Sequence, residues 1–177
     1  MANQKRILVL GVGNVLYTDE GIGVRLAEQL LSEYEFSDNV TVMDGGTLGT
    51  RLMGPIMESD YLIVCDAVLG DGPPGSIYRL TGDDLRQSLA FKNSMHDTDL
   101  VDTLIYCELA GNRPEAVIIG MEPEDYHTMA TDLSAAAAAN IPQMVEHVLA
   151  EITAIGGTYK PREHASEEIV YVPRSSC

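Results

Sequence analysis

The sequence predicts a single α/β domain built around a mostly parallel β-sheet. Short runs of branched apolar residues alternate with longer stretches in which apolar residues recur at helical spacing. The apolar runs end in glycine or in a carboxylate, which is typical of parallel strands that lead into a ligand-binding edge. The chain of 177 residues is long enough to bury one core, and no internal repeat or clear domain boundary divides it.

The first half of the chain has the pattern of a βαβαβ unit. Ile7–Val12 is an almost continuous apolar run that leads into a glycine turn, which predicts a parallel strand buried on both faces. Thr18 or Asp19 is the expected N-cap of a helix whose apolar positions fall at helical spacing from residue 22 to residue 31. The elements expected next are a strand over 40–43, a helix over 48–58 and a strand over 61–65.

The second half begins with a loop that strongly breaks regular structure, Gly70-Asp71-Gly72-Pro73-Pro74-Gly75. Residues 76–80 are expected to add an antiparallel edge strand or a hairpin arm. Beyond Gly156-Gly157 the periodicity is lost, so we place the domain at 1–155 and expect 156–177 to be a mobile or loosely docked tail. The remaining expected elements are a helix over 98–109, a strand over 116–121 and an alanine-rich helix over 133–152.

Charge and cysteine content argue against several functions. The 27 acidic and 11 basic side chains give a net charge of −16, which would repel a nucleic-acid backbone, although most of these acids are expected to be solvated surface. Cys65, Cys107 and Cys177 lack C-x-x-C spacing, so we expect neither a disulfide framework nor a cysteine metal site, and a reducing cytoplasm. No secretory signal or membrane span is recognised, so we expect no membrane insertion.

Carboxylates stand where the predicted strands end, at the edge where open parallel sheets bind ligands. Asp44, Asp66 and Glu122 each follow a strand, and Glu20 begins the first helix. Two carboxylates about 4 Å apart repel by roughly 4 kcal/mol at an effective dielectric near 20, so a converging set needs a proton or a cation. Together with one histidine, such a set suits nickel, zinc, iron or manganese, and the residues alone do not choose among them.

These acids also have structural interpretations. Asp19 and Glu20 can complement a helix N-terminus. Asp44 can accept hydrogen bonds from backbone amides of the turn that follows it. Asp66 directly follows an apolar run, where a carboxylate without a purpose is costly, so a functional role is favoured there.

Four histidines compete for the third ligand position. His147 falls inside a predicted helix and His164 in the tail, which favours surface or packing roles. His127 lies in a polar loop and His96 just ahead of a helix, so spacing leaves both open.

The turn Gly11-Val12-Gly13 raises the alternative of a dinucleotide site. Leu16 occupies the place of the third glycine in that motif, so the glycines more simply allow a tight turn and close approach of a ligand or partner. Cys65 belongs to a buried apolar run and is expected to be a small core residue. No G-x-S-x-G, H-E-x-x-H or P-loop pattern is present.

Residues 7–25, ILVLGVGNVLYTDEGIGVR, closely resemble the opening segment of the [NiFe]-hydrogenase maturation proteases. Further motifs follow in that family's order, and together they span roughly residues 7–150: Asp44-Gly-Gly-Thr47, Asp66-Ala67, Ser94-Met-His96 and Ile119-Gly-Met-Glu-Pro123. The resemblance implies a three-layer α/β sandwich, with helices on both faces of a twisted, mostly parallel sheet.

The same resemblance implies that Glu20, Asp66 and His96 bind a metal and that Asp44 matters for activity, with a catalytic role as base or orienter. Where relatives carry glutamine or another polar residue after the loop histidine, this chain has Asp97, which can shift the local cation field.

The implied activity is removal of the C-terminal extension of a hydrogenase large-subunit precursor, after a His or Arg near the last cysteine motif. The implied metal is nickel that arrives with the substrate, although other divalent ions can occupy the site in vitro. We expect a monomeric cytoplasmic endopeptidase. The alternatives are a non-enzymatic nickel-binding chaperone, a nucleotide-binding regulator and a broad-specificity protease.

Overall fold

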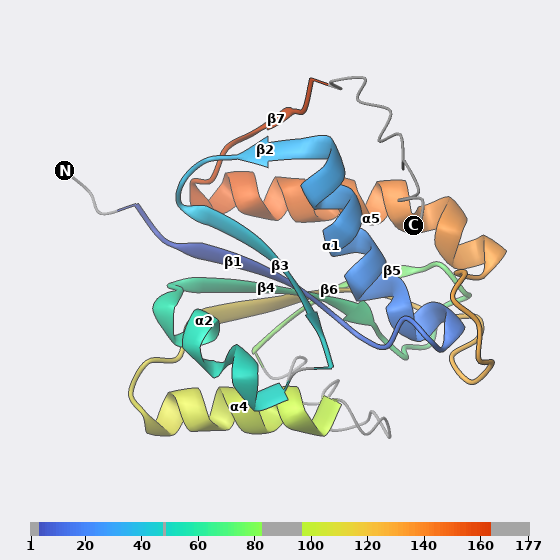
Figure 1. Ribbon diagram of the computed structural model, residues 1–177, viewed down its shortest axis with the longest axis horizontal. Coiled ribbons are helices and arrows are strands. Elements are labelled where there is room, and N and C mark those ends of the chain that lie inside the picture. The colour runs from blue at the N-terminus through green and yellow to red at the C-terminus, as the bar shows by residue number, and fades with distance from the viewer. Residues whose placement is uncertain (1–3, 48, 83–96, 164–177) are drawn as a thin grey trace, which may run out of the picture.

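The computed structural model describes residues 4–47, 49–82 and 97–163, which form the expected three-layer α/β sandwich (Figure 1). The five-stranded sheet has the order β3-β1-β4-β6-β5, in which only β5 is antiparallel to its neighbour. Helices α1 and α5 cover one face and α2 and α4 the other. The strands are β1 (Ile7–Val12), β3 (Val40–Gly46), β4 (Tyr61–Ala67), β5 (Ile77–Thr81) and β6 (Glu115–Met121). The helices are α1 (Ile22–Glu33), α2 (Met53–Glu58), α4 (Asp97–Leu109) and α5 (Ala135–Ile155), with 3-10 turns η1 (Thr18–Gly21) and η2 (Gly49–Leu52).

The core lies in two layers, one on each side of the sheet. Alternate residues of β4 divide between them, so that Ile63 and Cys65 join the layer under α1 and α5, whereas Leu62 and Val64 join the layer under α2 and α4. Because β1, β4 and β6 are buried on both faces, their sequences are almost continuously apolar. Within the described ranges, no helix has both the length and the apolar character to cross a membrane.

Helix α1 lies unusually close to the sheet because glycines face each other at the contact. A Cβ on Gly11 would collide with the carbonyl oxygen of Gly23, and a Cβ on Gly23 would collide with the carbonyl oxygens of Val12 and Cys65. Gly11 in β1 and Gly23 in α1 therefore let the chain's own helix approach the sheet, where the sequence suggested a ligand or partner. This contact sets the position of η1, just before α1, against the end of β4.

Helix α5 has clear start and stop signals. Its N-cap is Ser134, whose hydroxyl oxygen accepts a hydrogen bond from Ala137 N at 3.2 Å. Its C-cap is Gly156, at φ 105°, a conformation that favours glycine. The helix thus extends three residues past its expected end at Ile152.

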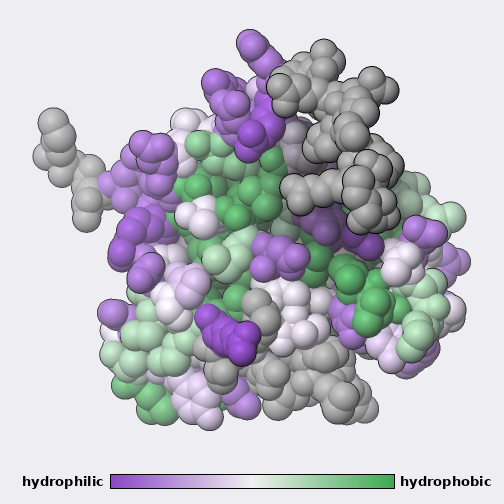
Figure 2. Space-filling model, viewed as in Figure 1, coloured by the Kyte–Doolittle hydropathy of each residue, from purple (hydrophilic) through white to green (hydrophobic). Residues whose placement is uncertain are grey.

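The expectation of a loosely docked tail from residue 156 is wrong for its first residues. Tyr159–Pro161 form β7, which pairs antiparallel with β2 (Tyr34–Phe36), and neither strand was expected. The ring of Tyr159 meets that of Tyr34 edge-on at 5.5 Å. Figure 2 shows hydrophobic surface between β2 and β3, with hydrophilic residues above it and to its left. Residues 164–177, including His164 and Cys177, lie outside the described residues.

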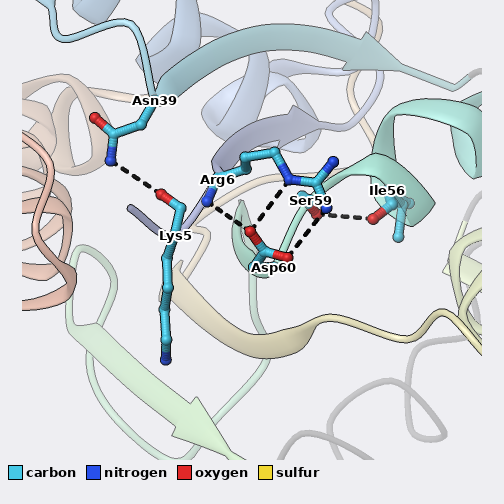
Figure 3. Close-up of polar contacts among 6 residues, drawn as sticks. All are labelled: Lys5, Arg6, Asn39, Ile56, Ser59 and Asp60. Carbon is cyan, nitrogen blue, oxygen red and sulfur yellow. Dashed lines mark hydrogen bonds and ion pairs between the residues drawn. The ribbon is translucent and has the colours of Figure 1, made fainter. Parts of the chain in front are cut away.

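At the edge of the sheet where the parallel strands begin, Asp60 joins the start of β4 to the start of β1 (Figure 3). Its carboxylate accepts Arg6 N at 2.8 Å and the Arg6 guanidinium at 3.1 and 3.2 Å. These hydrogen bonds from Arg6 lower the pKa of Asp60 to about 2. The pair thus joins the chain just before β1 to the chain just before β4.

Candidate functional site

The carboxyl edge of the sheet, where the parallel strands end, carries the candidate residues. In the register of the central strands, Gly11 pairs with Asp44 on one side and with Cys65 on the other. Asp66 is the next residue of β4 and pairs with Gly120 of β6. As expected for residues at the ends of parallel strands, Asp44 and Asp66 lie at the same edge of the sheet, with β1 between their strands.

Asp66 is buried in spite of its charge, with a side chain that is 4% exposed. One carboxylate oxygen accepts the backbone N–H of Ala67 at 2.7 Å. By strand alternation it belongs to the face covered by α2 and α4, like Leu62 and Val64. A carboxylate buried at the end of an apolar strand is stable only where donors or a cation offset its lost hydration.

Glu20 lies in η1, one residue before Gly21, and is half-buried. Its backbone is held on both sides: Glu20 N donates to Tyr17 O at 2.9 Å, and Glu20 O accepts Asn14 N at 3.1 Å. The turn η1 contacts β4, the strand that carries Asp66 next to its last residue. Glu20 and Asp66 thus come from adjacent elements at one end of the sheet.

The candidate third ligand, His96, lies outside the described residues. Helix α4 begins at the next residue, Asp97, and packs on the sheet face to which Asp66 belongs. It also contacts η2, which follows β3 at the carboxyl edge, so α4 starts near that edge. The assignment of His96 stays a prediction.

Asp44 is exposed and takes part in the turn at the end of β3. Its Oδ1 accepts the N–H of Gly46 at 2.9 Å, which is the structural role that the sequence allowed. Strand alternation assigns Asp44 to the α1 and α5 face, opposite to Asp66. The two side chains can therefore approach one substrate only beyond the end of the sheet, and the catalytic role of Asp44 stays a prediction.

The predicted N-cap of α1 is wrong. The cap residue is Gly21, with no side-chain hydrogen bond, because Thr18 and Asp19 are engaged elsewhere. Thr18 Oγ1 donates to Thr128 O at 2.8 Å, and the Asp19 carboxylate accepts hydrogen bonds from Glu124 N and Ser134 N, each at 2.8 Å. We call residues 124–134, which connect β6 to α5, the anchor segment.

The anchor segment is itself ordered by an acidic side chain. Asp125 accepts the backbone N–H groups of His127 and Thr128 at 2.9 and 3.0 Å. Hydrogen bonding by Thr128 and then by His127 lowers the pKa of Asp125 to about 2. His127 is exposed there beside the Tyr126 ring, and His147 is exposed on α5.

Glu122, the other strand-end acid, holds a loop. Its Oε2 accepts Gly70 N at 2.6 Å and the Tyr78 hydroxyl at 2.8 Å, and that hydroxyl accepts Gly72 N at 2.9 Å. Burial and then the bond to Glu122 raise the pKa of Tyr78. Like Asp19, Glu122 is committed to internal donors, which sequence position alone does not reveal.

Cys65 has a structural role. Cys65 is fully buried, and burial, followed by the charge of Asp66, raises the pKa of its thiol. Cys65 is therefore a core residue, as predicted.

The donor set of Glu20 and Asp66 is compatible with a borderline divalent metal but is incomplete by itself. Within residues 4–47, 49–82 and 97–163, no three His, Cys, Asp or Glu side chains form a group that could hold a metal ion. Two carboxylates and one imidazole suit such an ion, and the sequence offers His96, beyond these ranges, as the source of the imidazole.

Comparison with known proteins relates the whole fold to one family. A family model described as hydrogenase maturation protease matches residues 24–151. The hydrogenase 2 maturation protease of Escherichia coli (strain K12) is 37% identical over 160 residues, covering 89% of this chain and 97% of that protein. The hydrogenase expression/formation protein HupD of Rhizobium leguminosarum bv. viciae is 40% identical over 143 residues, covering 80% of this chain and 71% of that protein.

A solved structure agrees with these sequence matches. The hydrogenase maturating endopeptidase HybD from E. coli has a TM-score of 0.84 and 37% identity, covering 89% of this chain and 98% of that one. At this coverage the likeness extends over all three layers of the sandwich.

Proposed function

Because this chain belongs to the hydrogenase maturation protease family, we propose that it removes the C-terminal extension of a [NiFe]-hydrogenase large-subunit precursor that already carries nickel. In this proposal the nickel is part of the substrate. Glu20, Asp66 and His96 complete its coordination, so that only a metallated precursor is held in the pose for cleavage.

The observation that carries the proposal is the placement of Glu20 and Asp66. They come from two elements that touch at the carboxyl edge, and the close contact of Gly23 with the end of β4 fixes how these elements meet. Asp66 is buried near the end of the pairing of β4 with β6, at the same edge. Two preset carboxylates bind a substrate-borne cation at little cost in ordering.

Holding the metal also holds the peptide bond near it, and proximity then supplies much of the rate enhancement. Asp44 is our candidate for the group that orients or deprotonates the attacking water. Asp44 lies at the same edge as Asp66 with β1 between their strands, on a turn stabilised by the hydrogen bond that its carboxylate accepts from Gly46 N. The net charge of −16 also favours cationic partners for the chain as a whole.

The test is to offer the purified protease both nickel-loaded and metal-free precursor and to follow loss of the extension by mass spectrometry. We expect cleavage of the loaded form only, and equal cleavage of both would refute the gating by nickel. Glu20→Gln, Asp66→Asn and His96→Ala should each abolish or strongly reduce cleavage.

Histidine controls make the ligand assignment specific. His147→Ala, at an exposed position of α5, should cleave like the wild type, as should His127→Ala in the anchor segment. If His96→Ala cleaved the precursor normally and His127→Ala did not, the third ligand would be assigned to His127.

A further inference from the structure

We propose that Asp19 is a positioning residue, which holds Glu20 in place by tying η1 to the anchor segment. The inference rests on the proposed function, in which Glu20 binds the substrate's metal. Asp19 does not touch the metal in this scheme and acts only through its neighbour.

The Asp19 carboxylate is fully buried, with 0% exposure, and is surrounded by donors. Oδ2 accepts Glu124 N at 2.8 Å, Asp125 N at 3.2 Å and the Ser134 hydroxyl at 2.7 Å, and Oδ1 accepts Ser134 N at 2.8 Å. Ser134 is also the N-cap of α5, so the carboxylate lies at the positive end of that helix. These charge-assisted bonds make Asp19 a strong link between η1 and α5.

The backbone next to Asp19 is fastened to the same segment. Thr18 N donates to Ala130 O at 2.8 Å, Ala130 N donates to Leu16 O at 3.0 Å, and Asp19 N donates to Asp125 O at 2.9 Å. Thr18 has φ 39° and is the one non-glycine residue at positive φ within the described ranges. A β-branched residue is strained in that conformation and stays there only where its surroundings hold it.

Glu20 immediately follows this fastened stretch, so its Cα cannot move independently. A Cβ on Gly13 would collide with the carbonyl oxygen of Glu20, which leaves no slack between the turn after β1 and η1. Metal ligands must be held within roughly 0.5 Å of their productive positions, and that demands support from neighbouring residues. The contacts of Asp19 with the anchor segment supply this support.

The direct variant is Asp19→Asn, which keeps the shape but places an NH2 group against N–H donors. The matched control is Glu151→Gln, near the other end of α5, where a buried carboxylate accepts the Tyr61 hydroxyl and the Arg79 guanidinium, each at 2.9 Å. Both variants should lower the melting temperature of the full chain. Only Asp19→Asn should reduce kcat for the nickel-loaded precursor, by about 10- to 100-fold with little change in KM, as expected for residues behind a metal ligand.

A double variant tests whether Asp19 acts through Glu20. Asp19→Asn combined with Glu20→Gln should cleave no more slowly than Glu20→Gln alone, because the group that Asp19 positions is already lost. Independent, multiplying effects would overturn the inference. The inference would also be overturned if Asp19→Asn had the same kcat as Glu151→Gln while Glu20→Gln cleaved more slowly than both. Wild-type cleavage by Glu20→Gln would overturn the proposed function and this inference with it.

A second variant covers the case in which Asp19→Asn does not fold. Thr18→Gly adopts φ 39° without strain but loses the bond from Thr18 Oγ1 to Thr128 O, so it should fold and yet loosen η1. We expect a reduced kcat with unchanged secondary structure by circular dichroism. A wild-type kcat in this variant would contradict the claim that contacts between η1 and the anchor segment hold Glu20 in place.

Discussion

Replacing Gly23 by alanine tests how tightly α1 must lie on the sheet for the edge to function. The new methyl group would collide with the carbonyl oxygens of Val12 and Cys65 and would lie 2.8 Å from the Cys65 carbonyl carbon. These atoms belong to buried strands and cannot rotate away, as a flexible side chain would. The helix must therefore move outward, carrying η1 and Glu20 away from Asp66.

The magnitude follows from two opposing effects. Overpacking a core typically costs about 1–3 kcal/mol, and rigid backbone neighbours favour the upper end, near 3 kcal/mol. Alanine is a better helix former than glycine by roughly 1 kcal/mol, which offsets part of that cost. The expected loss is about 2 kcal/mol, or a melting temperature lower by about 4–8 °C for a chain of this size.

The assay pairs thermal or urea unfolding with cleavage of nickel-loaded precursor at a temperature where the variant is folded. Ser32→Ala is the matched control, because Ser32 is exposed on the same helix and its change should stay within about 0.5 kcal/mol. We expect Gly23→Ala to lose cleavage as well as stability. A variant as stable and as active as wild type would show that the close contact of α1 with β4 does not set the geometry of the edge.

Two further predictions concern the polar contacts at either end of the sheet. Tyr78→Phe should destabilise the chain by about 1–2 kcal/mol in urea unfolding, because Gly72 N and the buried carboxylate of Glu122 each lose a partner. An unchanged urea midpoint would contradict a stabilising role of the Tyr78 hydroxyl in this loop. Acid should weaken the contact of Asp60 with Arg6, because the pKa of Asp60 is about 2 in the folded protein and 3.8 ordinarily. The contribution of this contact to stability is complete above pH 3.8 and is lost as the pH falls toward the folded-state pKa of about 2. Asp60→Asn should therefore lose less stability than wild type between about pH 5 and pH 3, and equal losses would refute this assignment.

Most of the fold could be predicted from local patterns. The four parallel strands and the antiparallel edge strand β5 were expected within a few residues of their actual ends. For β1, β4 and β6 the reason is that burial on both faces leaves almost continuous apolar runs. β2 and β7 were not predicted because neither strand contains a buried apolar run. Each has three residues without a fully buried side chain, and they are joined by backbone pairing between Tyr34 and Pro161, which are far apart in sequence.

The site was predictable only in part. The strand-end rule led to Glu20, Asp44 and Asp66, and the structure brings all three to the carboxyl edge. The same rule could not separate them from Asp19 and Glu122. Asp19 bonds to residues 105 to 115 positions away, and no local pattern announces such partners.

The opposite roles of Asp19 and Glu20 follow from the geometry of η1. In a 3-10 turn successive side chains diverge by about 120°, so adjacent acids cannot face the same surroundings. Asp19 is directed into the protein, where backbone N–H groups and the start of α5 take up its charge, and Glu20 is left half-buried beside β4. Recruiting Asp19 as a ligand would require the anchor segment to detach, at the cost of several charge-assisted hydrogen bonds worth roughly 1.5–3 kcal/mol each. In the proposed scheme, a substrate cation at this edge therefore meets Glu20 and not Asp19, and Asp19 serves to hold Glu20 in place.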